Sequence, residues 1–283
     1  MWSTAIRFTW IIAKKAVRKF FADNGVLLAS ALAFDLLLYS IPLSMLLISA
    51  LGYTVVGSER ALSDVSAVVE RLLPISHEDF MTNLSHIVAN RGPLGLAGFV
   101  IFFVLSSAVF GTVRAILNRV FDVQRPRTYL KGKGRDFVVM LVAAALLILM
   151  FTSSWVLTFL RGFAERFSVL VPVLQPGWVV ATHLLGFLFT IALFYVLYRF
   201  CPKKILRRDS LLLAALAGTA LLDLSKWAFT WYAAFAQTNV ALYGALGAFI
   251  FFILWLYYGS VVLIIGAEIG WSYEQARTNP PES

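Results

Sequence analysis

The stretch Ala245–Ala267, ALGAFIFFILWLYYGSVVLIIGA, contains no charged residue and is long enough to cross a bilayer, since a transmembrane helix needs about 20 apolar residues. The rest of the chain has the same character. Of its 283 residues, 60% are hydrophobic and 14% are charged, whereas soluble domains are about 45–50% apolar and about 25% charged. A difference of this size requires an apolar solvent, so the sequence predicts an all-α integral membrane protein.

Five further segments also have the length and hydropathy of transmembrane helices. They are Val26–Val56, Leu94–Val113, Phe137–Leu160, Gly177–Tyr198 and Leu211–Phe235. We therefore expect six transmembrane helices that form a single transmembrane domain over residues 1–283. Pro42 lies inside the first helix, where it removes a backbone hydrogen-bond donor, and it predicts a kink at that point.

The basic residues are distributed unevenly between the two sides of the predicted helices. Most of the 24 Lys and Arg residues lie in the N-terminal segment, in the connections after the second and fourth helices, and in the C-terminal tail. The positive-inside rule places these parts in the cytoplasm, so both termini are expected there (N-in/C-in). Because this rule accounts for the net charge of +9, we expect no nucleic-acid partner.

Residues 1–25 predict a basic amphipathic helix at the membrane interface. Cations gather on one side of Trp2–Phe21, and apolar side chains lie beside them. The cations are Arg7, Lys14 and Arg18, and the apolar residues are Ile6, Trp10, Val17 and Phe21. Such a helix lies flat on the inner surface, with its cations near anionic lipid headgroups. The alternative is a continuous extension of the first transmembrane helix into the cytoplasm.

Residues 57–93 form the longest connection, on the outer side of the membrane. Apolar residues recur in it at helical spacing on both sides of Pro74. We expect an external helical loop of two short amphipathic helices that cap the outer face. The alternative is a solvated loop.

Three stretches carry a resemblance to a known family. They are Ala29–Gly52 (ASALAFDLLLYSIPLSMLLISALG), Ala115–Val123 (AILNRVFDV) and Tyr243–Ile269 (YGALGAFIFFILWLYYGSVVLIIGAEI). Together with the six-helix layout, they resemble the YihY/BrkB family of bacterial inner-membrane proteins. The resemblance implies a multi-pass protein of the bacterial cytoplasmic (inner) membrane. That family was formerly mislabelled ribonuclease BN and is otherwise described as virulence-associated or as transporters.

Ionisable residues inside apolar helices are the best functional signal in the sequence, because a charge at the bilayer centre costs at least about 2.5–3.5 kcal/mol. Asp35 lies in the first predicted helix. Asp223 and Lys226 lie in the fifth, at a spacing that lets them pair on one helical face. We expect these three residues to line a polar cavity. The alternative is a structural Asp223–Lys226 pair, with Asp35 protonated or hydrogen-bonded to a neighbouring helix.

Glu268 lies where the sixth predicted helix reaches the cytoplasm. We expect an interfacial carboxylate in water, which a cation at the same depth, such as Arg114 or Arg119, could neutralise.

Small residues predict close helix packing or hinges near both ends of the sixth helix. They are Gly244 and Gly247 at its start, and the Gly-x-x-x-Gly pair Gly266 and Gly270 at its end.

The sequence does not predict an enzyme. His77 and His86 fall on opposite faces of any shared helix, and common nucleophile, metalloprotease and phosphate-binding motifs are missing. We therefore expect no catalytic residue, metal site or cofactor. The leading hypothesis is a transporter that moves an ion, a small solute or a lipid-like amphiphile through a polar-lined cavity in the six-helix bundle. The alternative is a non-transporting envelope protein that organises lipids, and a membrane-bound ribonuclease or other hydrolase ranks below both. An oligomer is compatible with each of these.

Overall fold

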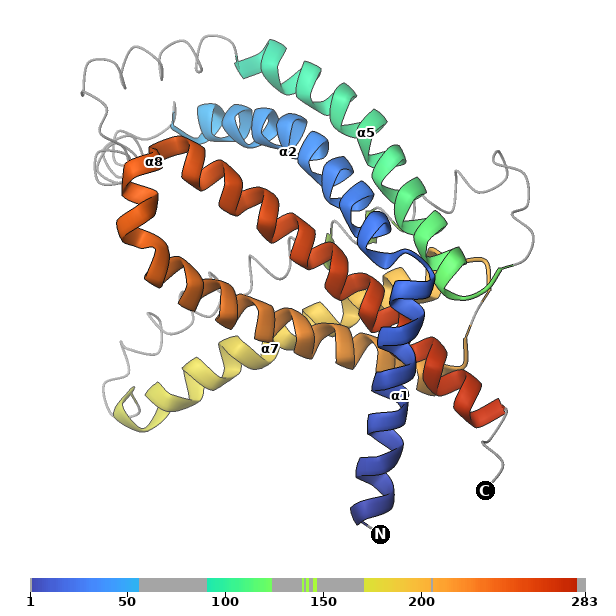
Figure 1. Ribbon diagram of the computed structural model, residues 1–283. Coiled ribbons are helices and arrows are strands. Elements are labelled where there is room, and N and C mark those ends of the chain that lie inside the picture. The colour runs from blue at the N-terminus through green and yellow to red at the C-terminus, as the bar shows by residue number, and fades with distance from the viewer. Residues whose placement is uncertain are drawn as a thin grey trace. The chain divides into compact units, whose positions relative to one another are not determined.

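The structure of the protein, a computed structural model, describes the backbone of residues 2–55, 91–123, 139, 141–142, 145–146, 171–204 and 206–278. Over these residues the regular structure is helical throughout, which confirms the all-α class. The helices are α1 (Trp2–Ala22), α2 (Gly25–Val55), α5 (Arg91–Val120), α7 (Val171–Phe200) and α8 (Arg208–Thr278), as Figure 1 shows.

Four helical segments among the described residues are long and apolar enough to cross a membrane. They are Gly25–Leu46, Leu96–Val120, Arg208–Tyr232 and Phe249–Thr278. These segments overlap the first, second, fifth and sixth predicted transmembrane helices, and the fourth lies within α7. Most of the third, Phe137–Leu160, and most of the external loop lie outside the described residues. The count of six helices and the orientation of the chain therefore stay predictions.

The chain divides into two compact units by its internal contacts. The first comprises Met1–Ala33 with Phe110–Ser283, and the second comprises Phe34–Val109. The single transmembrane domain expected from the sequence stays a prediction.

A tight turn separates α1 from α2. Asn24 has a backbone φ of 58°, a left-handed conformation that Asn tolerates better than most residues. Gly25 follows it with its backbone against the ring of Phe20, where a Cβ atom would overlap that ring. The expected alternative of one helix running from the cytoplasm into the membrane is therefore wrong, because α1 ends at Ala22 and α2 starts in a new direction (Figure 1).

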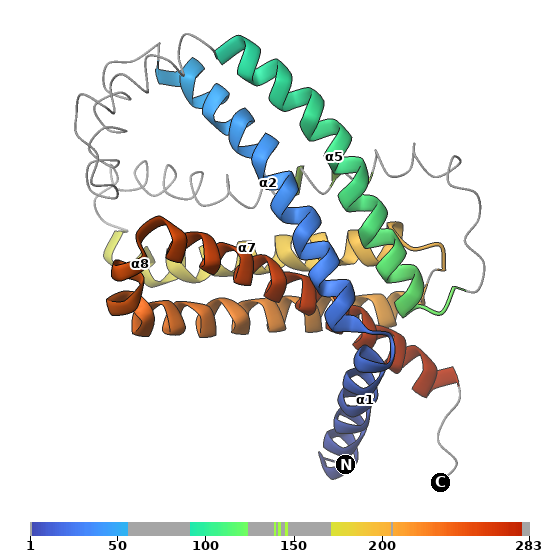
Figure 2. The ribbon, with the colours of Figure 1, turned by 45° about the horizontal axis from the view of Figure 1, so that its top comes forward.

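Helix α8 turns back on itself between its two candidate membrane segments, so it forms a hairpin with two antiparallel legs (Figures 1 and 2). The fifth and sixth predicted helices thus belong to one helical element instead of two. The legs approach most closely at small residues. A Cβ atom added to Gly266 would lie 3.0 Å from the Cα of Gly218, and one added to Gly270 would lie 2.6 Å from the Cβ of Ala214. The Gly-x-x-x-Gly pair therefore serves close packing, as its spacing predicts.

Polar contacts join the two ends of the α8 hairpin. The hydroxyl of Ser210 and the backbone N–H of Arg207 both donate to the carboxylate of Glu274. Beside them, Arg277 donates to Asp209 at 2.9 Å. These contacts hold the first turn of α8 against its last turns.

Helices α1 and α7 both pack against α8 within the first unit. From α7, the fully buried Tyr198 stacks on Phe194, with 5.6 Å between ring centroids, and donates its hydroxyl to the carbonyl of Leu263 at 2.8 Å. This hydrogen bond satisfies the buried hydroxyl of Tyr198. From α1, the residues Ile12, Ala16 and Phe20 are buried at a spacing of four, which places them on one face of the helix.

In the second unit, α2 packs along α5. The rings of Tyr39 and Phe102 lie 4.8 Å apart, and Gly98 lets α5 approach Met45, because an added Cβ atom would come within 3.1 Å of that side chain. Pro42 is buried and α2 continues through it as far as Val55. A kink at Pro42 stays a prediction.

Candidate functional site

Asp223 and Lys226 form the ion pair that their spacing predicts. Both lie on the first leg of α8, and the ammonium of Lys226 lies 2.8 Å from the carboxylate of Asp223. The side chains of Asp223 and Lys226 are 44% and 40% exposed, so the pair is half-exposed. Exposure leaves the ammonium of Lys226 accessible to a ligand from outside the protein.

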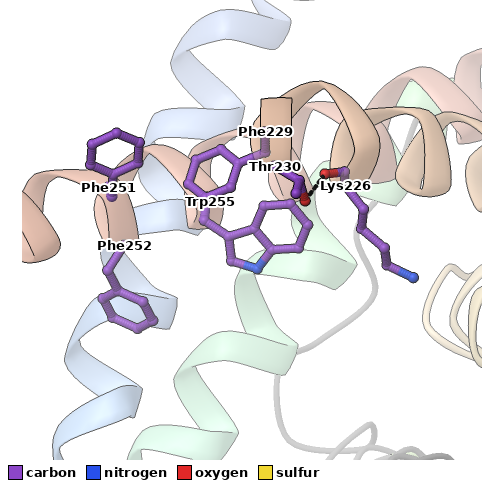
Figure 3. A pocket seen from close by; sticks show the side chains of 6 residues that line it. All are labelled: Lys226, Phe229, Thr230, Phe251, Phe252 and Trp255. Carbon is purple, nitrogen blue, oxygen red and sulfur yellow. Dashed lines mark hydrogen bonds between the residues drawn. The ribbon is translucent and has the colours of Figure 1, made fainter. Parts of the chain in front are cut away.

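An open pocket of about 350 Å³ adjoins Lys226. Both legs of α8 line it, with Lys226, Phe229 and Thr230 from the first and Phe251, Phe252 and Trp255 from the second (Figure 3). The ring of Phe229 lies 5.5 Å from that of Phe251 and 5.2 Å from that of Trp255, and so fills the space between the legs. The hydroxyl of Thr230 donates to the carbonyl of Lys226 at 2.8 Å, so helix backbone already occupies this donor.

The chemistry of this pocket is that of an amphiphile site. Its walls are aromatic, and Lys226 is the charged residue of its lining, with a side chain that extends away from the rings in Figure 3. An apolar chain can lie against the rings while an acidic headgroup competes with Asp223 for the ammonium. Because the cation already has a carboxylate partner, binding of an anion replaces one charge-assisted contact by another.

Asp35 lies in the other unit, half-buried on α2. The structure therefore supports the Asp223–Lys226 pair as one site, while a cavity shared with Asp35 stays a prediction. Gly247 is buried on α8, and Gly244 lies in the same helix; a hinge at either residue stays a prediction.

Glu268 differs most from its prediction. We expected a carboxylate in water, but the structure buries it completely within the protein. Its ion-pair partner is Lys19 of α1, at 3.7 Å, a distance too long for a hydrogen bond but short for charge attraction. The sequence suggested Arg114 or Arg119 of α5 as the cation that neutralises Glu268. In the structure the cation is Lys19, which lies on the N-terminal helix.

Lys19 stands at the centre of a charged cluster that joins three parts of the chain. Besides facing Glu268, its ammonium donates to Asp23 and lies 3.4 Å from Asp122, which follows α5 in a left-handed conformation (φ 51°). The ring of Trp271 lies 4.5 Å from the same ammonium, which adds a cation–π contact. We call these five residues the Lys19 cluster.

The charges around Lys19 keep it protonated. Burial alone lowers the pKa of Lys19, but the hydrogen bond to Asp23 and the charges of Glu268 and Asp122 outweigh it, so the pKa lies above its ordinary value of 10.5. A lysine this close to three carboxylates acts as a permanent cation that holds α1 against α8.

Two of the stretches that carried the family resemblance meet at the Lys19 cluster. Ala115–Val123 contributes Asp122, and Tyr243–Ile269 contributes Glu268. From the first of these, the side chain of Asn118 also accepts a hydrogen bond from the backbone N–H of Lys203 at 2.9 Å. Sequence reasoning missed Lys19 because four other cations lie on the same helix. The available signal was its position on the helical wheel, which is about 100° or more from Arg7, Lys14 and Arg18 at 100° per residue.

The described part of the chain contains no group of three or more His, Cys, Asp or Glu residues that could hold a metal ion.

The long apolar helices, with ionisable side chains either paired or gathered in one cluster, define an α-helical membrane protein. The family model described as Virulence factor BrkB matches residues 16–283, so the chain belongs to that family. This confirms the resemblance noted in the sequence.

Similar curated proteins are also named as membrane proteins. A UPF0761 membrane protein of Pelodictyon phaeoclathratiforme is 27% identical over 259 residues, which cover 89% of this chain and 57% of the relative. One from Pseudoalteromonas atlantica is 22% identical over 279 residues, which cover 95% of this chain and 89% of the relative. The chain thus spans little more than half the length of some curated relatives and most of the length of others. No solved structure matches the chain.

Proposed function

We propose that the protein is a non-enzymatic transporter of the bacterial inner membrane, with both termini in the cytoplasm, and that it moves an anionic, lipid-like amphiphile. The observation that carries this proposal is the aromatic pocket between the legs of α8 with Lys226 at its edge. Among the substrates that the sequence left open, an amphiphile fits best, because an ion or a small polar solute gains little from walls of Phe and Trp.

The ion pair supports movement as well as binding. A lone lysine in an apolar pocket would hold an acidic headgroup tightly, whereas Lys226 can return to Asp223 when the headgroup leaves. Such exchange lowers the energetic difference between the loaded and empty states, which favours release. The uneven distribution of Lys and Arg supports the proposed orientation.

Vesicles that contain the purified protein test this proposal. The probes are phosphatidylglycerol and phosphatidylcholine, each with a fluorescent label on an acyl chain that dithionite bleaches in the outer leaflet. Phosphatidylcholine has no net charge and serves as the comparison. We expect the protein to carry inner-leaflet phosphatidylglycerol to the outside. Lys226→Gln should slow this about tenfold or more, since a hydrogen bond to a charged group contributes about 1.5–3 kcal/mol. It should slow phosphatidylcholine much less.

Lys204→Gln is the matched control, because it removes one exposed lysine outside α8. Trp255→Ala should slow both lipids, since it removes the apolar wall. Bleaching no faster than in vesicles without protein would refute lipid transport. If the protein then still bound the lipid, it would belong to the lipid-organising class.

A further inference from the structure

Helix α1 keeps an apolar face exposed after it has packed against α8. Trp10 is 70% exposed and Phe21 is 64% exposed, and Val17 lies between them in an exposed position on the same side. The face that packs on α8 is a different one, formed by Ile12, Ala16 and Phe20. A helix that buries one apolar face and exposes a second has two surfaces to cover, and α8 covers only the first.

Cations border the exposed face. Lys14 and Arg18 are exposed. On a helical wheel of about 100° per residue, they lie beside the stripe formed by Trp10, Val17 and Phe21. The other two lysines of α1 are engaged with the protein. Lys15 lies 5.4 Å from the ring of Trp271, and Lys19 belongs to the Lys19 cluster. Packing against α8 therefore leaves Lys14 and Arg18 facing outward, whereas Lys15 and Lys19 contact the protein.

The position of α1 in the chain brings this face to a bilayer. Only Asp23 and Asn24 separate α1 from the candidate membrane segment Gly25–Leu46, whose second and third residues, Val26 and Leu27, are exposed. This short connection keeps the C-terminal turns of α1, with Val17, Arg18 and Phe21, close to the start of the membrane segment. An apolar stripe with cations along its edge then meets acyl chains and acidic headgroups together.

We propose that the outer face of α1 is a docking surface for anionic lipid, in which Trp10, Val17 and Phe21 enter the headgroup region and Lys14 and Arg18 contact lipid phosphates. This surface is separate from the pocket at Lys226, and the inference goes beyond the proposed transport function and does not depend on it. It also narrows the expectation from the sequence, because two of the lysines of the N-terminal helix face α8 and not lipid.

Trp10 itself can report the contact in the full-length protein. The protein is placed in nanodiscs with brominated phosphatidylglycerol or brominated phosphatidylcholine, and the difference in emission between it and its Trp10→Phe variant isolates Trp10. We expect stronger quenching by brominated phosphatidylglycerol. The double variant Lys14→Gln/Arg18→Gln should lose that preference, by about fivefold for each charge, since a surface cation contributes about 1 kcal/mol.

Lys204→Gln/Arg208→Gln is the control, because it removes two exposed cations outside α1 and should leave the preference unchanged. Raising the salt concentration should weaken the preference in the unaltered protein, which tests the same charges without substitution.

Equal quenching by both lipids would overturn the recognition of anionic lipid. A Trp10 signal that neither lipid quenches would overturn docking altogether, and cross-links between α1 helices would then assign this face to a second copy of the chain. Failure of lipid transport in the vesicle assay would leave these outcomes untouched.

Discussion

At the scale of single side chains, the sequence predicted the partner of one charged group and not of another. The Asp223–Lys226 pair was predictable because its geometry is local, since a spacing of three fixes both residues on one helical face. The sequence indicated Glu268 as a candidate interfacial carboxylate, but its burial and its partner were not predictable. Its partner lies almost the whole length of the chain away, on a helix whose packing face depends on Ile12, Ala16 and Phe20 fitting α8. The packing of α1 against α8, and not the sequence near Glu268, therefore determines that Lys19 is the partner of Glu268.

Removal of Lys19 tests whether its cluster fixes α1 to α8. Lys19→Met leaves Glu268 buried without its cation, and breaking a buried ion pair typically costs about 3–5 kcal/mol. We expect a clear loss of thermal stability in detergent and a partial recovery in Lys19→Met/Glu268→Gln. The recovery is partial because Asp23 and Asp122 also lose their cation. Lys14→Met, on the same helix but with an exposed side chain on the outer face, is the control.

The pH dependence of this stabilisation follows from the direction of the shift. The pKa of Lys19 is raised in the folded protein, so its contribution is fully present below its unfolded pKa and disappears as the pH rises through the folded pKa. The loss of melting temperature caused by Lys19→Met should therefore shrink as the pH rises above 10.5, where Lys19 of the unaltered protein begins to lose its charge. Equal melting temperatures for Lys19→Met and Lys14→Met at neutral pH would contradict a structural role for the cluster.

At the scale of elements, the α8 hairpin sets the geometry of both sites. Small residues draw its legs together where Gly266 and Gly270 meet Gly218 and Ala214, and aromatic residues hold the legs apart at the pocket. The sequence predicted the apolar segments and the close packing at the glycines. It did not reveal which leg the glycines contact, because glycine spacing describes one surface and not its partner, nor that one helix runs through the turn.

Gly266→Ala tests the close approach of the two legs. The added methyl would lie 2.6 Å from the hydroxyl oxygen of Tyr198 and 3.0 Å from the Cα of Gly218, so the legs must separate or Tyr198 must give up its bond to Leu263. Overpacking of this kind costs about 1–3 kcal/mol, which should appear as a lower melting temperature in detergent. Gly259→Ala on the same leg is the matched control, since its added methyl meets no atom within 4 Å among the described residues. If both variants melted alike, the legs would not be held at this spacing.

At the scale of the whole molecule, the positions of Lys and Arg predict an orientation that a labelling experiment can check. The Lys19 cluster and the ends of the α8 hairpin belong to one unit, and the predicted orientation assigns both to the cytoplasmic side. The external loop and the basic connection after α5 should then lie on opposite sides of the membrane. Their sequences indicate the sides through charge alone, since the positive-inside rule needs no knowledge of packing.

Cysteine accessibility in intact cells distinguishes the two sides. Because the native Cys201 is buried, it should react little, and a Cys201→Ser background removes it as a source of signal. In that background, Asn83→Cys should react with a membrane-impermeant thiol reagent added from outside, whereas Leu130→Cys should react only after the cells are opened. The physical reason is the cost of moving a charged reagent through the hydrocarbon core, which confines it to the outer compartment.

The reverse pattern of labelling would mean that the protein has the opposite orientation in the membrane, with the anionic-lipid surface of α1 at the outer leaflet. Reaction of both cysteines in intact cells would mean that an odd number of membrane segments does not separate these positions, which contradicts the six-helix topology.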